Sequence, residues 1–418
     1  MTMTKIPLNI LIFIGLTAIF PLIDFLNGLF LTTGIPVPVG VSYRFVFLLF
    51  LLISIGMEDL PKSGLTYITF LFITGNLLIW LLQGIFLQNP ISWMMADLSV
   101  FIKYFLWVLI PYYIYQRKSI LRTIRYEELF IVISFLFTAG LLIPYVLGVG
   151  YQTYDNSDAG YKGYFFANND TSFAFIISIT FTARALWLQL AGKWNMRLLL
   201  LLVLYAGNII CLLLVGTKTG ILYGVTVSVF LLVHLLFGTG YRSTLHRILI
   251  WIASFLAIGW VVFRGIHYAV EIVEGTYERI VYFYHLYDGD LVRLLTSSRS
   301  DFLESGMTYF LEDSNLGFSF LFGQGFEYRL ENFGRFGLIE MDFFDGLFGL
   351  GILGILLLIV MLGYFLWLAF AKGERSIYSY MFLVIVMYSF FAGHVLFSAL
   401  SSTFLGLVCG GIILSRKE

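Results

Sequence analysis

The chain has 418 residues, of which 60% are hydrophobic and 12% are charged, and its mean hydropathy is +0.91. A composition this apolar excludes a water-soluble domain, because too few polar side chains are available to cover its surface. The 25 basic and 25 acidic residues cancel, so the net charge gives no reason to expect a nucleic-acid partner. The lipid bilayer is therefore the expected solvent.

Continuous apolar runs, such as residues 198–215, predict spanning helices and not the alternating strands of a β-barrel. A run of roughly twenty apolar residues crosses the hydrocarbon core of a membrane. The expected spans are 6–23, 43–57, 65–87, 98–115, 129–148, 172–190, 198–215, 221–237, 248–263, 344–370, 378–397 and 403–414. The sequence thus predicts an all-α, polytopic membrane protein of about twelve transmembrane helices.

Basic residues test this assignment, because each span carries the chain to the other side of the membrane. They occupy every second connection, namely Lys5; Lys62; Arg117, Lys118, Arg122 and Arg125; Lys193 and Arg197; Arg242 and Arg247; Lys372 and Arg375; and Arg416 and Lys417. We therefore expect both termini to be cytoplasmic. Three parts follow: residues 1–263 with spans 1 to 9, a long extracytoplasmic loop at 264–342, and residues 343–418 with spans 10 to 12.

Two cations on the outer side are candidate phosphate ligands. Lys218 lies in a Gly-Thr-Lys-Thr-Gly turn at 216–220, where an ammonium and several backbone amides can hold phosphate oxygens; contact with lipid headgroups explains the lysine equally well. Arg299 carries a planar guanidinium that suits a diphosphate. Its alternative is a salt bridge with Asp301 or Glu304 on the loop surface.

Carboxylates and amides form two further groups of candidates. Glu340, Asp342 and Asp345 lie at the mouth of the tenth span, where one can act as a general base for a sugar hydroxyl and another can hold a cation in position. In the loop before the sixth span, an aromatic ring, two amides and a carboxylate suit a carbohydrate, and a plain surface loop with a helix cap is the alternative. These residues are Tyr154, Asn168, Asn169 and Asp170.

Taken in order, these elements resemble the bacterial O-antigen polymerase (Wzy) and O-antigen ligase (WaaL) superfamily of integral-membrane glycosyltransferases. The resemblance rests on Phe-Ala-Asn-Asn-Asp at 166–170, Thr-Lys-Thr-Gly at 217–220, the Arg299 segment, Leu-Phe-Gly-Gln-Gly at 321–325 and the glycine-rich stretch at 342–354. It implies a GT-C-like fold in the bacterial cytoplasmic (inner) membrane, with the active face periplasmic or extracellular.

Two departures from the family pattern bear on function. Lysine stands at Lys218 where the family usually carries arginine, which keeps the charge but loses the fork. Glu340 stands where ligases carry a histidine, and the histidines of the loop, His267 and His285, lie far upstream. The second departure favours a polymerase over a ligase.

The resemblance therefore implies a polymerase that transfers an undecaprenyl-diphosphate-linked glycan onto the terminal sugar of a lipid-linked repeat unit. Lys218 and Arg299 would neutralise the departing diphosphate, with Arg329 and Arg335 in reserve, and no metal or cofactor is required. A chain-length regulator protein is an expected partner besides the lipid-linked repeat units and the bilayer. Two alternatives stay open: a transporter or flippase for a lipid-linked sugar, against which the absence of an internal repeat weighs, and a glycan ligase of the same superfamily.

Overall fold

The computed structural model describes residues 6–35, 37–154, 160–190, 195–237, 266–371, 375–391 and 393–416. Eight helices of this part are long and apolar enough to cross a membrane: α1 (Leu8–Thr32), α2 (Val39–Gly56), α3 (Gly64–Phe86), α4 (Ile91–Gln116), α6 (Tyr126–Val146), α7 (Asn168–Leu190), α8 (Met196–Val215) and α16 (Asp342–Phe370). Shorter apolar helices are α9 (Lys218–Phe237), α17 (Ile377–Phe391) and α18 (Ala399–Ser415). The all-α polytopic fold is confirmed, and the ninth expected span, 248–263, lies outside the described residues.

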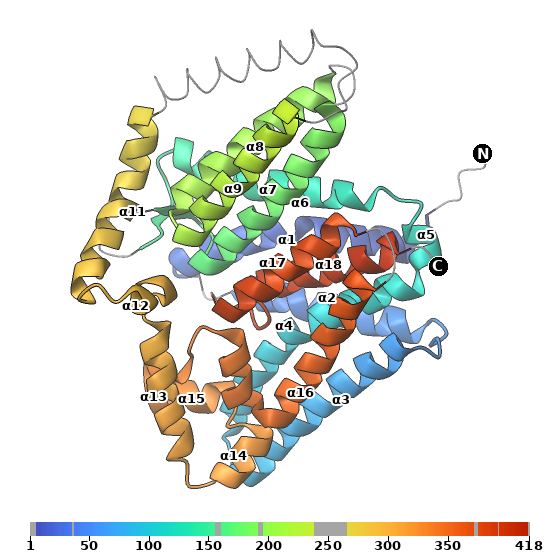
Figure 1. Ribbon diagram of the computed structural model, residues 1–418. Helices are drawn as coiled ribbons and strands as arrows, with labels where there is room; N and C mark the ends of the chain where they lie inside the picture. Colours follow the sequence, from blue (N-terminus) through green and yellow to red (C-terminus); the bar gives the residue numbers. More distant parts are fainter. Residues whose placement is uncertain are drawn as a thin grey trace. The chain divides into compact units, whose positions relative to one another are not determined.

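The long connection before α16 is itself helical (Figure 1). It contains α11 (Ile266–Leu286), α12 (Leu291–Thr296), α13 (Arg299–Leu311), α14 (Leu316–Phe322), α15 (Phe326–Phe333) and the 3-10 helix η2 (Gly334–Gly337). The remaining elements are α5 (Lys118–Leu121) and a two-stranded antiparallel hairpin of β1 (Tyr151–Gln152) and β2 (Tyr161–Gly163).

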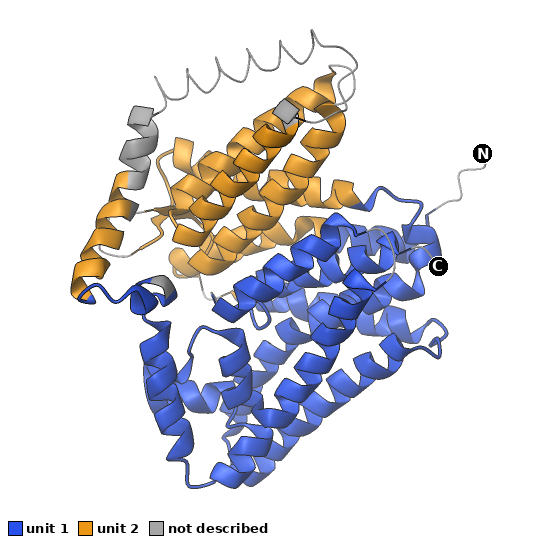
Figure 2. Ribbon diagram, viewed as in Figure 1, with its two compact units in different colours: residues 1–16, 38–126, 287–418 blue, residues 17–37, 127–286 orange. Residues whose placement is uncertain are grey.

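The chain divides into two compact units, residues 1–16, 38–126 and 287–418 in unit 1 and residues 17–37 and 127–286 in unit 2 (Figure 2). In unit 1, α4 packs against α2, α3 and α18. The approach of α18 to α4 is close because glycine faces it: a Cβ on Gly406 would lie 3.0 Å from the Cα of Trp107, and one on Gly410 would lie 2.2 Å from Ile114. Small residues at such contacts let membrane helices pack backbone to backbone.

Unit 2 is built on contacts among α7, α8 and α9. A buried polar cluster joins α6, α7 and α8, in which the amide of Asn208 donates to Ser134 at 3.0 Å and to Thr182 at 3.3 Å. The rings of Phe130 and Phe181 stack beside it, with centroids 3.9 Å apart. An amide that meets hydroxyls on two neighbouring helices fixes their register within an apolar interior.

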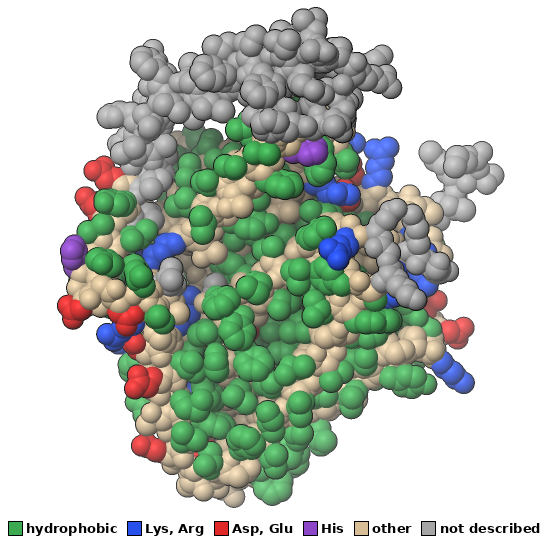
Figure 3. Space-filling view, viewed as in Figure 1, with side chains coloured by type: hydrophobic (Ala, Val, Ile, Leu, Met, Phe, Trp, Pro, Cys, Tyr) green, Lys and Arg blue, Asp and Glu red, His purple; other side chains and the backbone are tan. Residues whose placement is uncertain are grey.

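Exposed apolar side chains mark the surface expected to meet lipid. On α16, Leu353, Leu356, Ile359 and Val360 are all exposed. Figure 3 shows hydrophobic side chains over much of the viewed face. A contiguous apolar surface of this kind needs a nonpolar environment, which agrees with spanning helices.

Candidate functional site

The loop segment around residues 321–325 is fixed to a break in α16. Gly351 has φ 69° and ψ −175° inside that helix, so the carbonyls before it lose their usual helical partners. The amide of Gln324 donates to the carbonyl of Phe348 at 2.9 Å, and the amide of Gly325 donates to that of Gly349 at 3.0 Å. The Leu-Phe-Gly-Gln-Gly motif therefore docks on the broken helix and satisfies its free carbonyls.

Side chains of α3 and α4 strengthen this attachment. Gln83 donates from Nε2 to the carbonyl of Phe322 at 2.5 Å and to that of Gly349 at 2.7 Å. Asp97 accepts the amide of Glu327 at 2.8 Å, in the first turn of α15. The loop helices thus take their position directly from three spans of unit 1.

The part of the loop that belongs to unit 1, residues 287–342, is called the loop domain below. Arg329 is buried within it, with an exposed fraction of 1%. Its guanidinium donates to Gln324 Oε1 at 2.7 Å and to the carbonyl of Gly337 at 3.0 Å. Burial lowers the pKa of Arg329 to about 10, an effect that the nearby carboxylate of Asp345 opposes. The residue remains a cation at neutral pH, enclosed by the loop.

Asp313 completes the same network from the opposite end. Its Oδ2 accepts from Ser319 Oγ at 2.5 Å and from Gln324 Nε2 at 2.9 Å, and its Oδ1 accepts the amide of Asn315 at 2.9 Å. Burial raises the pKa of Asp313, but these three hydrogen bonds outweigh it and the pKa is lowered overall. Gln324 therefore links an ionised carboxylate to the Arg329 cation.

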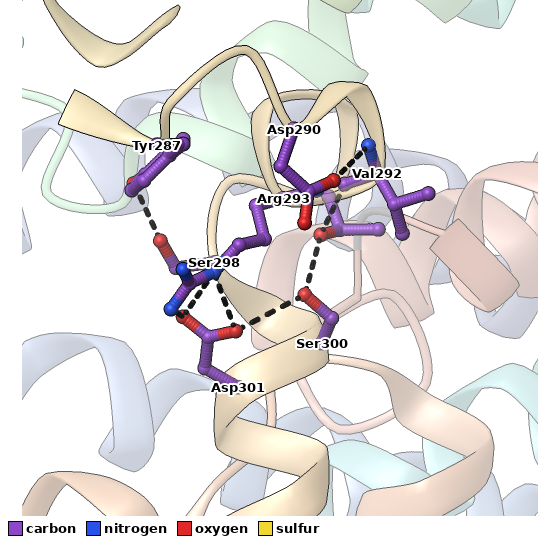
Figure 4. Close-up of polar contacts among 8 residues, drawn as sticks. Tyr287, Asp290, Val292, Arg293, Ser298, Ser300 and Asp301 are labelled. Carbon is purple, nitrogen blue, oxygen red and sulfur yellow. Dashed lines mark hydrogen bonds and ion pairs between the residues drawn. The ribbon is translucent and has the colours of Figure 1, made fainter. Parts of the chain in front are cut away.

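Arg299 begins α13 and pairs with Glu340, Nη2 to Oε2 at 2.9 Å. The Arg299 side chain is 10% exposed, whereas that of Glu340 is 42% exposed. The alternative pairing of Arg299 with Asp301 is not formed, because Asp301 accepts a bidentate pair of hydrogen bonds from Arg293 (Figure 4). The cation predicted to meet a diphosphate is thus held by a carboxylate that solvent reaches.

The turn into α13 is shaped by residues visible in the same close-up. Asp290 caps α12 by accepting the amide of Val292 at 2.8 Å, and Tyr287 bonds Ser298 at 2.5 Å (Figure 4). Ser297 and Ser298 both have a left-handed backbone, with φ 53° and 64°. The backbone therefore turns sharply just before Arg299, the first residue of α13.

Two of the three predicted carboxylates are buried and bind backbone. Asp342 Oδ2 accepts from Ser389 Oγ at 2.8 Å and from the amides of Val395 and Leu396 at 2.8 and 3.1 Å. Asp345 Oδ1 accepts the amide of Ile339 at 2.6 Å. Both are almost inaccessible, so Glu340 is the carboxylate of the three that faces solvent.

His394 was not among the sequence candidates, and the structure places it at this cluster. It is half-buried, has φ 57°, and interacts electrostatically with both Asp342 and Asp345. The sequence placed this position inside a span expected at 378–397. That expectation ran too far, because α17 ends at Phe391 and Gly393 turns the backbone into the left-handed region.

Arg335 lies apart from these buried contacts, on η2. Its side chain is exposed, and its guanidinium covers the rings of Phe336 at 5.0 Å and Phe302 at 5.9 Å. Cation–π contacts of this kind hold an arginine at a surface without removing its charge.

The other candidates belong to unit 2 and gather at two helix starts. Lys218 is the first residue of α9, and Thr217 beside it bonds Ser172 of α7 at 2.5 Å. Asn168 begins α7 and donates to the carbonyl of Thr153 at 2.6 Å, and Asp170 is buried in the first turn of the same helix. Asn169 is half-buried beside it.

Tyr154 takes part in a contact that the sequence did not indicate. The guanidinium of Arg279, from α11, lies 3.6 Å from the centre of the Tyr154 ring and 5.0 Å from that of Phe283. Arg279 also interacts electrostatically with Lys218. Unit 2 therefore brings two cations toward the start of α9.

Together these features define a multi-pass, all-α membrane protein in which a helical loop domain holds cations and carboxylates at the mouth of a span. The family model of O-antigen ligase like membrane proteins matches residues 4–273, more than half of the chain. The protein belongs to this family, and the predicted superfamily is confirmed. No curated protein matches the chain.

Membership in this family supports a membrane enzyme that processes lipid-linked glycans. The matched residues include Lys218 and the candidates at the start of α7, and they end before Arg299. The roles of the loop residues therefore rest on their geometry.

Proposed function

We propose that this protein is a polymerase of O-antigen or capsule type. It transfers a glycan from undecaprenyl diphosphate to the terminal sugar of a second lipid-linked repeat unit, at the outer face of the bacterial cytoplasmic membrane. A hydroxyl oxygen of the acceptor attacks the anomeric carbon of the donor. The bond from that carbon to the phosphate oxygen breaks, the electron pair leaves with undecaprenyl diphosphate, and the hydroxyl proton passes to a base.

The observation that carries this proposal is the Arg299–Glu340 pair. Arg299 is nearly buried and fixed by the turn before α13, so its guanidinium is oriented before any ligand arrives. The guanidinium donates to one carboxylate, that of the partly exposed Glu340. A diphosphate offers more charge and more oxygens to the same fork, so it can replace Glu340 on Arg299.

A cation at this position would stabilise the negative charge of the leaving group. The diphosphate is already a competent leaving group, and the enzyme must orient two lipid-linked substrates and stabilise the charge that develops on the departing oxygen. Arg299 is proposed to supply that stabilisation in unit 1. Lys218 is proposed separately as a phosphate ligand of unit 2. Arg329, enclosed by its own network, supports the loop, and the exposed Arg335 is available to a second phosphate.

The test compares Arg299→Ala with Arg293→Ala. Arg293 is a matched control, because it is an arginine of the same loop whose ion pair with Asp301 is solvent-exposed. Each variant is expressed in a strain that lacks the gene, and the lipid-linked glycans are separated by length. Arg299→Ala should insert at the wild-type level and lower polymerisation on the order of 10²-fold or more, whereas Arg293→Ala should restore normal polymer.

Three outcomes would contradict parts of this proposal. Normal chain lengths with Arg299→Ala would remove Arg299 from the mechanism. Glycan transferred to an acceptor other than a lipid-linked repeat unit would identify a ligase. Repeat units that fail to reach the outer face in the deletion strain would identify a transporter.

A further inference from the structure

The connection between α17 and α18 is held tightly against the start of α16. Asp342 accepts the amides of Val395 and Leu396 in this connection and also the hydroxyl of Ser389, which lies near the end of α17. Gly393 lies so close to the carbonyl oxygen of Glu340 that a Cβ there would be 1.7 Å from it. The residue between these attachment points is His394, so its backbone position is determined from both sides.

His394 and Glu340 are both non-glycine residues with a left-handed backbone, at φ 57° and 62°. Such a conformation is uncommon and persists where the surroundings impose it, often at functional sites. Here the two segments that contain these residues touch through Gly393 and the Glu340 carbonyl. His394 therefore follows directly on a backbone contact with Glu340, the residue whose carboxylate holds Arg299.

The carboxylates of this cluster are poorly suited to accept a proton from a sugar hydroxyl. Glu340 already accepts a hydrogen bond from Arg299 through Oε2, so it is engaged in holding that cation. Asp342 and Asp345 are buried and accept backbone amides, so a substrate cannot reach them without breaking those contacts. A half-buried imidazole beside two carboxylates combines access with a partner for the positive charge it gains.

We propose that His394 is the general base of the glycosyl transfer. This inference rests on the proposed function and adds a residue to it. The proton of the acceptor hydroxyl passes to an imidazole nitrogen as its oxygen bonds to the anomeric carbon and undecaprenyl diphosphate departs. The imidazolium is stabilised by Asp342 and Asp345, returns the proton to solvent, and is neutral again for the next transfer.

Several charged or titratable groups lie around His394. Asp342 and Asp345 of α16 are electrostatically coupled to it, and Glu340 lies against its neighbour Gly393. Behind the carboxylates, Tyr104 of α4 interacts with Asp342, and Arg329 of α15 interacts with Asp345. A proton taken up by the imidazole would therefore lie near two carboxylates.

The left-handed backbone offers variants that fold. Glycine and asparagine adopt this conformation readily, so His394→Gly and His394→Asn remove the imidazole without straining the turn. His285, exposed on α11, provides the control His285→Asn. The assay uses the full-length protein in lipid nanodiscs and lipid-linked repeat units purified from the deletion strain.

Both His394 variants should lower kcat by about 10² to 10⁴-fold with KM within twofold of wild type. Imidazole added to the buffer should restore part of the rate of His394→Gly, which a merely structural histidine would not allow. His285→Asn should match wild type throughout.

A His394→Gly rate within twofold of wild type would overturn the assignment. A loss of rate that added imidazole does not reverse would also overturn it and would show a structural role. In both cases the wild-type protein still elongates the glycan, so the proposed function survives. If the wild-type protein transfers no glycan at all, the proposed function fails and the role of His394 fails with it.

Discussion

Replacing Arg329 with methionine tests whether the buried arginine stabilises the loop domain or is only tolerated there. Methionine keeps most of the volume, so the change in free energy of unfolding reflects the polar contacts. The acceptors Gln324 Oε1 and Gly337 O would lose their donors, which costs about 1–3 kcal/mol for each buried group. Against this, the lowered pKa of about 10 means that the folded state holds the cation at a cost of about 3 kcal/mol.

The two effects nearly cancel. The cost of leaving two buried acceptors without donors slightly exceeds the free energy gained by removing the buried cation, so we expect Arg329→Met to destabilise the protein by about 1 kcal/mol. The difference in melting temperature should be equal at about pH 6 and about pH 8, because the guanidinium stays charged across that range. Thermal unfolding in detergent measures it, with Arg335→Met on the exposed surface as the control. A variant more stable than wild type by 2 kcal/mol or more, on the order of what buried ion-pair replacements reach, would refute the reasoning.

Two further changes test the turn and the network. Gly393→Ala places a Cβ against the Glu340 carbonyl at a residue with φ 65°, so it should lower the free energy of unfolding by more than about 2 kcal/mol and remove most of the transferase rate. The control Gly363→Ala adds a Cβ that meets open space on α16 and should change neither quantity. Equal results for the two variants in unfolding and transfer assays would argue against the close contact. Asp313→Asn should lower the melting temperature at neutral pH, and its difference from wild type should shrink below about pH 4. A carboxylate whose pKa is lowered in the folded state stabilises the fold above its unfolded pKa and loses that effect when it is protonated. A difference in melting temperature that stays constant down to acid pH would contradict the role of the Asp313 charge.

The spanning helices were predictable because the bilayer imposes a length and an apolar composition on each of them. The short helices α14 and α15 were not, since seven or eight residues show too little periodicity. Their positions depend on Gln83, Asp97 and the break at Gly351, which are tertiary contacts.

The candidate site was predictable in its residue types and less so in its pairings. Arg299 and Glu340 were each singled out, but their ion pair joins positions 41 residues apart and cannot be read from local pattern. The local alternative, Asp301, was taken by Arg293. His394 escaped notice because Val395, Leu396 and Phe397 after it continue an apolar run, so the segment looked like the end of a span. Only the left-handed turn at Gly393 and His394 reveals that the helix has already ended.

Backbone strain and charge coincide in this part of the protein. Ser298 precedes Arg299, and Glu340 and His394 are themselves left-handed, so all three polar side chains leave the backbone at or next to an unfavourable conformation. Each costs of order 1–3 kcal/mol and must be compensated by surrounding contacts. Those contacts are the hydrogen bonds of Asp342 and the packing of Gly393 on Glu340. A site held this way has its charges oriented before a ligand arrives. This is the condition under which fixed charges would stabilise most strongly the departing diphosphate of the proposed reaction.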